Sequence, residues 1–306
     1  MHPDHVVEVD GIRKAYGRTV AVADVTFTVR RGEIFGLIGP NGAGKTTTLE
    51  CVEGLRAPDA GRIEVLGFDP IRDRRALQLR IGVQLQEAQL QRRIKVWEAV
   101  AFWQSLYPDP ADGDGLLRQL GLDEKRNAWF MTLSGGQKQR LFIALALVND
   151  PEVVFLDELT TGLDPQARRA IWDLVRDIRE RGKTVVLTTH LMEEAERLCG
   201  RVAILDRARI VDIDTPAALV ERHCPQRTVV VATDSGSAAE RFRALPTTTS
   251  VRSDGHRHEI AGRGDALVTD VIRTISAHGM PVSEFRTELP NLEDVFLTLT
   301  GRSIRA

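Results

Sequence analysis

The sequence predicts an α/β domain over residues 1–222 and a smaller α+β domain over residues 223–306. Strand-like and helix-like segments alternate through the first part, a pattern typical of a parallel sheet covered by helices. Beyond about His223 the segments shorten and turn residues become frequent. A chain of 306 residues is long enough for each domain to bury a core of its own.

The first domain opens with β-rich segments, which lie at residues 6–9, 20–29 and 62–66. Residues 33–38 are mostly apolar and predict a buried strand that leads into a glycine-rich turn. Residues 46–54 predict the helix after that turn. This order of strand, glycine-rich turn and helix is the context that a phosphate-binding loop requires.

The middle of the chain interrupts this alternation. Residues 93–120 have a mostly helical pattern broken by prolines and a Gly/Asp turn, and they predict a helical subdomain inserted over about residues 88–150. The α/β pattern then resumes at residues 152–156 and 183–188. Both segments are apolar and β-branched, so they predict interior strands of a parallel sheet.

The second domain is predicted from its turns. Asp254-Gly255 lies between two strand-like segments and is a strong hairpin signal. His256 and His258 flank this turn, and we expect them to be exposed hairpin residues rather than metal ligands. The segments follow the order βαββαβ, which suggests a ferredoxin-like module. They are a strand at 228–232, a helix near 238–244, a hairpin of 250–253 and 257–261, a helix marked by Leu267, Val271 and Ile275, a strand at 282–288, and a last helix between Asn291 and Gly301.

Composition limits the partners that this chain can bind. The formal net charge of −2 lacks the basic excess typical of nucleic-acid binding, so no nucleic-acid partner is expected. The three cysteines are scattered and indicate a reducing compartment. The N-terminus has no signal-peptide pattern, and the longest apolar run, residues 141–148, is too short to cross a bilayer. We therefore expect a soluble chain, unless a partner holds it at a membrane.

The glycine-rich turn has the spacing of a nucleotide-binding loop, Gly39-Pro40-Asn41-Gly42-Ala43-Gly44-Lys45-Thr46. Its glycines let successive backbone N–H groups point into one concavity, where they can bind phosphate oxygens. The N-terminal end of the following helix adds its partial positive charge. Lys45 can neutralise the β- and γ-phosphates, and the Thr46 hydroxyl can ligate Mg²⁺. These residues and the adjacent Thr47 are the predicted nucleotide-binding residues.

A second glycine-rich turn, Leu133-Ser134-Gly135-Gly136-Gln137, also leads into a helix. Ser134 and Gln137 have the spacing of a capping box, so this turn could serve only to start the helix. Capping alone, however, does not require two adjacent glycines. With both turns in this order, the chain resembles the ATP-binding subunits of ABC transporters over about residues 5–220, and the second turn matches the signature sequence of that family.

The resemblance implies a role for several polar residues. Asp157, at the end of an apolar strand, corresponds to the residue that holds Mg²⁺, and Glu158 to the residue that activates the attacking water. His190 corresponds to the switch histidine, which approaches the γ-phosphate. Gln86 corresponds to the glutamine that senses the metal or the water. Gln84 is the alternative for this last role.

Three further positions complete the comparison. Tyr16 lies where the family stacks an aromatic ring on adenine, although an ordinary packed tyrosine is the alternative. Asp164 ends the D-loop, where the resemblance places it among the nucleotide-binding residues, and it is also predicted to cap the next helix, which begins with Pro165. Leu159 departs from the family, in which proline usually follows the glutamate. Because leucine does not lock φ and keeps its N–H, the turn into the D-loop is expected to be less rigid.

The signature turn implies a dimer. It contains no positive side chain, so it would capture ATP poorly by itself, whereas the Gly39–Thr46 loop leaves one side of the γ-phosphate open. In the family, the signature of one subunit closes over the ATP held by the other. Since this chain has one copy of each motif, the resemblance implies a second nucleotide-binding subunit, most simply a second copy.

The resemblance predicts an ATPase, with ATP and Mg²⁺, that drives export through a separate transmembrane permease at the cytoplasmic face of the membrane. The segments around Asp164 and His190 and the Leu289-Pro290-Asn291 tail are most similar to the antibiotic- and multidrug-export branch. A soluble ABC ATPase acting on nucleic acid or the ribosome is the first alternative. Such proteins typically carry two cassettes or basic linkers, which this sequence lacks. A ligand-sensing regulator is the second alternative.

Overall fold

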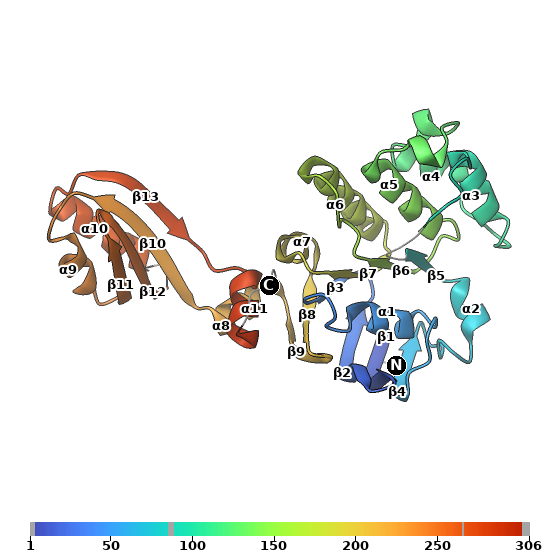
Figure 1. Cartoon of the computed structure of the whole chain (residues 1–306), viewed down its shortest axis with the longest axis horizontal. Coiled ribbons are helices and arrows are strands. Elements are labelled where there is room, and N and C mark those ends of the chain that lie inside the picture. The colour runs from blue at the N-terminus through green and yellow to red at the C-terminus, as the bar shows by residue number, and fades with distance from the viewer. Residues whose placement is uncertain (1–3, 85–88, 265, 302–306) are drawn as a thin grey trace. The chain divides into compact units, whose positions relative to one another are not determined.

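The computed structural model describes residues 4–84, 89–264 and 266–301, drawn in Figure 1. The chain forms two compact units, unit 1 up to Pro216 and unit 2 from Ala217 onward. The helix at this junction spans Pro216–His223. The sequence-based division between residues 222 and 223 would assign all of this helix except its last residue to the first domain. No helix of the described residues is both long and apolar enough to cross a membrane.

Unit 1 is built around a nine-stranded sheet of order β4-β1-β2-β9-β8-β3-β7-β6-β5. Its elements are β1 (His5–Tyr16), β2 (Thr19–Arg30), β3 (Ile34–Ile38), α1 (Lys45–Val52), β4 (Ala60–Val65), α2 (Arg74–Gln78), β5 (Ile81–Gln84), α3 (Val96–Gln104), α4 (Gly113–Gln119), the 3₁₀ turns η1 (Asp123–Lys125) and η2 (Phe130–Thr132), α5 (Gly135–Ala146), β6 (Val153–Asp157), α6 (Pro165–Glu180), β7 (Thr184–Thr189), α7 (Met192–Leu198), β8 (Arg201–Asp206) and β9 (Arg209–Asp214).

The central strands of unit 1 are parallel, as the sequence predicted. β7 pairs in parallel with β3 on one side and with β6 on the other, and every residue of these three strands is buried. Their registers align Ile38 with Thr189 and Asp157 with Thr188. The carboxyl ends of β3, β6 and β7 therefore meet at one edge of the sheet, where ligands bind in folds of this kind.

Two other groups of elements extend this core. The strand β1 pairs in antiparallel fashion with β2 on one side and β4 on the other, and these three strands pack around α1. The helices α3, α4 and α5 lie together on the opposite side of the central strands (Figure 1). The glycine-rich turn after β3 and the turn that precedes α5 thus belong to different parts of unit 1.

Unit 2 consists of a four-stranded antiparallel sheet of order β11-β12-β10-β13 with helices around it. The chain order β10-α9-β11-β12-α10-β13 confirms the predicted βαββαβ pattern. Asn291 caps the last helix and Gly301, with a φ of 71°, ends it, as predicted. The elements are α8 (Pro216–His223), β10 (Gln226–Thr233), α9 (Ala238–Arg243), β11 (Thr248–Asp254), β12 (Arg257–Arg263), α10 (Ala266–Ala277), β13 (Val282–Glu288) and α11 (Leu292–Thr300).

One expectation about the hairpin was wrong. His256 is exposed and forms an ion pair with Asp234, but His258 is buried, with only 5% of its surface accessible. His258 shares a hydrogen bond with Ser253 Oγ and packs against the Phe242 ring. Side chains alternate along a strand, so two residues beyond the turn can already lie in the core. Burial lowers the pKa of His258.

Candidate functional site

Two glycines of the loop after β3 occupy positions where a side chain would collide with backbone. A Cβ atom on Gly39 would lie 2.2 Å from the carbonyl oxygen of Leu205, and one on Gly44 would lie 2.2 Å from that of Ala21. Gly42 has open space around it, but its φ of 78° is rare for L residues. The glycine spacing therefore allows the loop to curl tightly against the neighbouring chain.

The same loop begins α1 without a capping side chain. Gly44 is the N-cap residue, and the first turn of α1 contains no acidic residue. The N–H groups of this turn have no helical acceptor and no side-chain cap, so they can bind an anion. Within the loop, the Ala43 N–H donates to the Pro40 carbonyl at 3.2 Å, and Asn41 is exposed.

Lys45 is buried in this loop. Its Nζ donates to the carbonyl oxygens of Gly39 and Pro40, at 2.8 and 3.1 Å, and lies 3.6 Å from Glu158 Oε1. Burial lowers the pKa of Lys45, and the negative charge of Glu158 opposes that shift. A buried cation held by carbonyl groups and one carboxylate is well placed to bind the negative charge of a phosphate.

Asp157 faces the same loop from the end of β6. Its Oδ1 accepts a hydrogen bond from Thr46 Oγ1 at 3.4 Å and a short one from Thr188 Oγ1. Burial raises the pKa of Asp157, although both hydroxyls favour its charged form. Thr47, in the same helical turn as Thr46, is half-buried. Asp157 and Thr46 together form a small set of oxygen donors, the ligand type that Mg²⁺ prefers.

Glu158 lies at the centre of the cluster. Its Oε1 is 3.5 Å from His190 Nδ1, and its Oε2 accepts from Thr161 Oγ1 at 3.3 Å. The residue has a φ of 47°, in the left-handed region, which costs a non-glycine residue about 1 kcal/mol or more. The Glu158 N–H donates to the Thr188 carbonyl and hydroxyl oxygens, at 3.2 and 3.1 Å, and these bonds hold the strained residue in place.

Leu159, the departure from the family pattern, has a buried side chain with 1% of its surface accessible. Full burial of a leucine contributes about 1.5–3 kcal/mol. The turn after Glu158 is therefore anchored by apolar packing, which a leucine supplies without fixing φ.

A buried carboxylate supports the segment after this turn. Glu194, in α7, accepts hydrogen bonds from Thr160 Oγ1 at 2.7 Å and from Trp172 Nε1 at 2.8 Å. Only 1% of the Glu194 surface is accessible. Thr160 lies two residues after Glu158, and α7 begins two residues after His190, so this carboxylate connects the chain segments that carry both residues.

The turn before α5 forms the capping box that its sequence allowed. Ser134 Oγ accepts from the Gln137 N–H at 3.3 Å, and Gln137 Oε1 accepts from the Ser134 N–H at 3.0 Å. The glycines have a separate reason: a Cβ on Gly136 would lie 3.1 Å from Ala167 Cβ, and one on Gly135 would touch Leu163. Ser134 and Gly135 remain exposed. The turn therefore packs closely on the start of α6 and still presents a surface to a partner.

Tyr16 and Asp164, two further predicted residues, lie on the surface. Tyr16, at the end of β1, is 43% exposed, and the guanidinium group of Arg56 lies 5.5 Å from its ring centroid. Asp164 caps α6, as predicted: its Oδ1 accepts from the N–H groups of Gln166 and Ala167 at 3.0 and 2.9 Å. An exposed ring can stack on a base, whereas the geometry of Asp164 is that of a helix cap.

Known proteins resemble the chain along nearly its whole length. It is 38% identical to Nod factor export ATP-binding protein I of Ralstonia nicotianae, over 98% of this chain and 95% of that protein. It is 34% identical to linearmycin resistance ATP-binding protein LnrL of Bacillus subtilis, over 98% of this chain and all of that protein. A family model described as ABC transporter matches residues 22–161. The chain belongs to the ABC transporter family.

Solved ATP-binding subunits of this family share the fold. The fold matches cbiO1 of Clostridium perfringens with a TM-score of 0.65 and a dimeric ATP-binding cassette bound to ADP and Pi with a TM-score of 0.61. Both are 26% identical to this chain and cover 72% and 68% of it, with 96% and 98% of their own chains matched. This ABC protein is thus an export-type ATP-binding subunit, and such subunits hydrolyse ATP to drive transport.

The glutamine expected to sense the metal, Gln86, lies outside the described residues. Gln84, the alternative, is the last residue of β5, and its side chain is buried beside β6.

Sequence reasoning missed two residues of the site in this ABC subunit. Thr188 donates to Asp157 and accepts from the Glu158 N–H, and Glu194 joins Thr160 to Trp172. The available signal for Thr188 was its hydroxyl near the end of β7, a group that Thr184 and Thr189 in the same strand also carry. Nothing in the sequence around Glu194 distinguishes it from the neighbouring acidic residues of α7.

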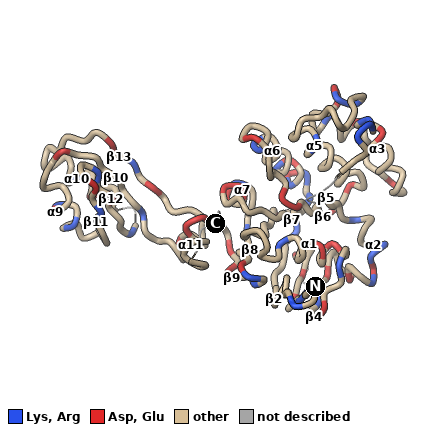
Figure 2. Tube along the Cα trace, viewed as in Figure 1, with Lys and Arg blue, Asp and Glu red and all other residues tan. Residues whose placement is uncertain are grey.

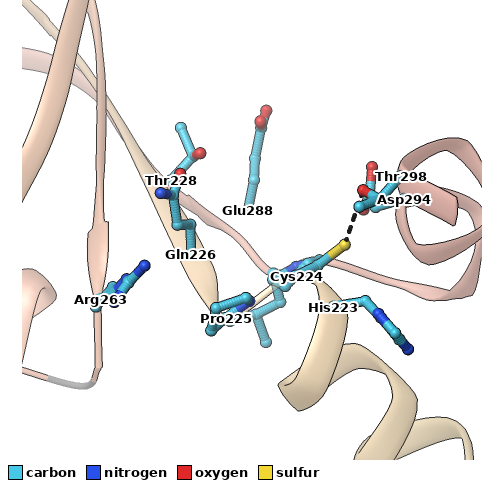
Figure 3. Close-up of a pocket in the computed structure, with 11 residues that line it drawn as sticks. His223, Cys224, Pro225, Gln226, Thr228, Arg263, Glu288, Asp294 and Thr298 are labelled. Carbon is cyan, nitrogen blue, oxygen red and sulfur yellow. Dashed lines mark hydrogen bonds between the residues drawn. The ribbon is translucent and has the colours of Figure 1, made fainter. Parts of the chain in front are cut away.

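A separate hollow of about 480 Å³ lies within unit 2, between the sheet and α11 (Figure 3). Arg263 borders it on one side, and Asp294 and Glu288 border it on the others, so its lining carries both signs of charge. Cys224 also lines the hollow, with its Sγ 3.4 Å from Thr298 Oγ1. This hollow contains none of the residues predicted to bind the nucleotide.

Proposed function

We propose that this ABC subunit binds ATP with Mg²⁺ at the loop after β3 and hydrolyses it with Glu158 as the residue that activates water. The main support is the position of Glu158, 3.6 Å from Lys45 and 3.5 Å from His190, directly after Asp157. A carboxylate poised in this way contributes about 10²–10⁴ in rate as a general base.

In this proposal the loop binds and orients the triphosphate. The N–H groups at the start of α1 and the Lys45 ammonium bind the phosphate oxygens. A γ-phosphate beside Lys45 would replace Glu158 as its anionic neighbour, and the Glu158 carboxylate would then accept a proton from water. His190, within reach of Glu158, would donate to the γ-phosphate and orient it. Tyr16 would stack on the adenine ring, and Arg56 would cover the other side of the tyrosine.

Thr46 and Asp157 fit a Mg²⁺ ion. Thr46 Oγ1 and Asp157 Oδ1 lie 3.4 Å apart, so two oxygen ligands are close together. Burial raises the pKa of Asp157, and a bound cation would stabilise its charged form. When bound, Mg²⁺ supplies charge neutralisation at the β- and γ-phosphates. The hydroxyl of Thr188 would hold Asp157 in the required orientation.

We further propose that two copies of the chain share each ATP. Ser134 and Gly135 are exposed, and the hydrogen bonds of Ser134 stay within its own turn. The turn therefore offers N–H groups and a hydroxyl, with no cation, to a triphosphate held elsewhere. A related cassette was solved as a dimer with ADP and Pi. In this arrangement unit 1, with α3–α5 as its helical part, is the nucleotide-binding domain and unit 2 is an accessory domain.

Two variants test the catalytic assignment and the shared site. Glu158→Gln should keep ATP binding but lose at least about 100-fold in turnover and accumulate an ATP-dependent dimer. Its matched control is Glu180→Gln, on the exposed end of α6, which should leave turnover unchanged. Ser134→Asp keeps a capping residue but places a negative charge against the phosphate, so it should stop turnover while monomers still bind ATP. Vigorous turnover by either site variant would contradict its assignment.

The names of the relatives support a transport role. They concern Nod factor export and linearmycin resistance. We propose that this subunit drives export of an amphiphilic compound, such as an antibiotic, through a separate permease at the cytoplasmic face of the membrane. Co-expression with the membrane protein encoded beside it should move the subunit into the membrane fraction, and vesicles holding both should transport in an ATP-dependent way. A subunit that remains in the soluble fraction would contradict this role.

A further inference from the structure

The edge strand β13 of unit 2 is unusually open. Every residue of β13 except Glu284 is exposed. It is the last strand of its sheet, and no strand in the described parts of the chain pairs with its outer edge. Large apolar side chains are exposed on it and just beyond it: Val282 at 37%, Phe285 at 39% and Leu289 at 61%. Proteins usually protect such edges because their free N–H and C=O groups pair with other strands.

The two faces of β13 differ in chemistry. Phe285 lies opposite Val231 of β10, and Val231 belongs to the core beneath α9 and α10. On the other face, acidic and basic residues alternate, as the colours along β13 indicate in Figure 2. Arg286 lies there between Glu284 and Glu288, at 3.4 and 2.6 Å from their carboxylates. The strand thus presents a minus-plus-minus row on one face and an exposed aromatic ring on the other.

This row is complementary to a second copy of itself in one register. Two identical strands related by a two-fold axis pair in antiparallel fashion, and one residue then faces its own copy. If that residue is Phe285, Glu284 lies opposite the partner's Arg286 and Arg286 opposite the partner's Glu284. Opposite charges and aromatic pairs in facing positions each contribute about 0.2–1 kcal/mol.

The neighbouring registers are unfavourable. If Arg286 faces its own copy, two guanidinium groups meet and Glu284 faces the partner's Glu288. If Glu284 faces its own copy, two carboxylates meet. Centring the pair on Thr287 keeps Arg286 opposite the partner's Glu288 but brings in Pro290, which has no N–H to donate. Like charges in facing positions destabilise a sheet, so the register centred on Phe285 is favoured.

We propose that two copies of this chain associate through β13, paired in antiparallel fashion about Phe285, so that their four-stranded sheets join into one. The central pairs, from Glu284 to Arg286, lie in the stretch where β13 pairs regularly with β10, and the register shifts only between Val282 and Glu284. The opposite edge, β11, exposes no large apolar side chain among its residues.

This interface uses none of the residues that bind the nucleotide. The β13 interface rests on the proposed function only in one respect: like the ATP-dependent homodimer, it brings together two copies of the chain. A contact through unit 2 would keep the copies associated while their nucleotide-binding surfaces open between rounds of hydrolysis. The second copy would then be at high local concentration, and each ATP-driven closure would be an intramolecular step.

Disulfide cross-linking without nucleotide tests the register. Cys51 and Cys199 are buried, so a Cys224→Ser background removes the remaining accessible thiol. In this background Phe285→Cys should yield a covalent dimer on oxidation, because facing Cβ atoms lie about 4.5–5.5 Å apart in such pairs. In this register Thr287 faces Ser283 of the other copy, four residues from the other copy's Thr287. Two Thr287→Cys thiols would therefore be too far apart to bond, and this variant should stay monomeric. Cross-linking of Thr287→Cys instead, or of neither variant, would overturn the proposal.

Charge reversal provides a second test that does not disturb the core. Arg286→Glu should weaken the self-association of the nucleotide-free chain, measured by sedimentation, at least about tenfold. The reason is that residue 286 would then place a carboxylate opposite Glu284 of the other copy in both symmetry-related pairs. The double variant Glu284→Arg/Arg286→Glu should restore it, and Arg252→Glu on β11 is the matched control that should leave it unchanged. A wild-type chain that stays monomeric, or a double variant that fails to recover, would refute the β13 interface. The ATP-dependent dimer of Glu158→Gln is measured separately, so either proposal can fail alone.

Discussion

Glu53 is a buried carboxyl group that nothing in the site explains. It follows α1 and has 3% of its surface accessible, and its Oε1 has no hydrogen-bond partner. Burial, with smaller contributions from the negative charges of Asp157 and Glu50, raises the pKa of Glu53 from 4.5 to about 8. At neutral pH the folded chain therefore keeps a proton that the unfolded chain releases.

This difference in pKa makes the free energy of unfolding depend on pH. Because the folded pKa lies above the unfolded one, the stability that this group contributes is fully present below pH 4.5 and is lost as pH rises through about 8. One pKa unit corresponds to about 1.4 kcal/mol, so the shift from 4.5 to about 8 amounts to about 4–5 kcal/mol. Glu53→Gln replaces the carboxyl group by a neutral amide of the same shape. This variant should not lose stability as the pH rises.

The assay is denaturant unfolding of the nucleotide-free chain between about pH 5 and 9, followed by tryptophan fluorescence. The four tryptophans, Trp97, Trp103, Trp129 and Trp172, all lie in unit 1, so the signal reports on the unit that contains Glu53. The advantage of Glu53→Gln over the wild type should grow with pH. Glu180→Gln, on an exposed part of α6, is the control and should show no such growth. A constant difference between Glu53→Gln and wild type across this range would refute the reasoning.

Three further predictions concern the site. Glu194→Ala should destabilise unit 1 by about 2–4 kcal/mol, because it leaves two buried donors unpaired, whereas Glu194→Gln should retain most of the stability in the same unfolding assay. Gly44→Ala should abolish nucleotide binding in a fluorescent-ATP titration, since its Cβ would meet the Ala21 carbonyl at 2.2 Å. Gly182→Ala, which also has a positive φ but open space around it, should bind normally. Tyr16→Ala should weaken ATP binding by about 1–3 kcal/mol while Tyr16→Phe binds as wild type, and equal affinities for all three would exclude stacking.

Part of the site was predictable because it depends on local backbone geometry. The glycine spacing from Gly39 to Gly44 predicts a curled loop. In the structure, a Cβ atom added at either of these two glycines would collide with a backbone carbonyl oxygen. Asp164 before Pro165 predicts a helix cap, which its hydrogen bonds form. Such features need only a few consecutive residues, so their pattern is legible in the sequence.

Other parts depend on residues brought together from distant segments. Thr188 reaches Asp157 only because β7 and β6 pair in one particular register, and Glu194 reaches Thr160 only because α7 packs beside α6. The burial of His258 likewise follows from the face of β12 that the sheet turns toward its helices. No run of neighbouring residues specifies these contacts.

The class of fold, the phosphate-binding loop, the order of elements in unit 2 and the family resemblance are all legible in the chain before it folds, because each is encoded in local spacing or periodicity. The strained position of Glu158, the support from Thr188 and Glu194, and the open edge at β13 arise only in the folded chain. These depend on strand register and on which edge of a sheet stays uncovered, and both are set by packing across the whole unit rather than by any one segment.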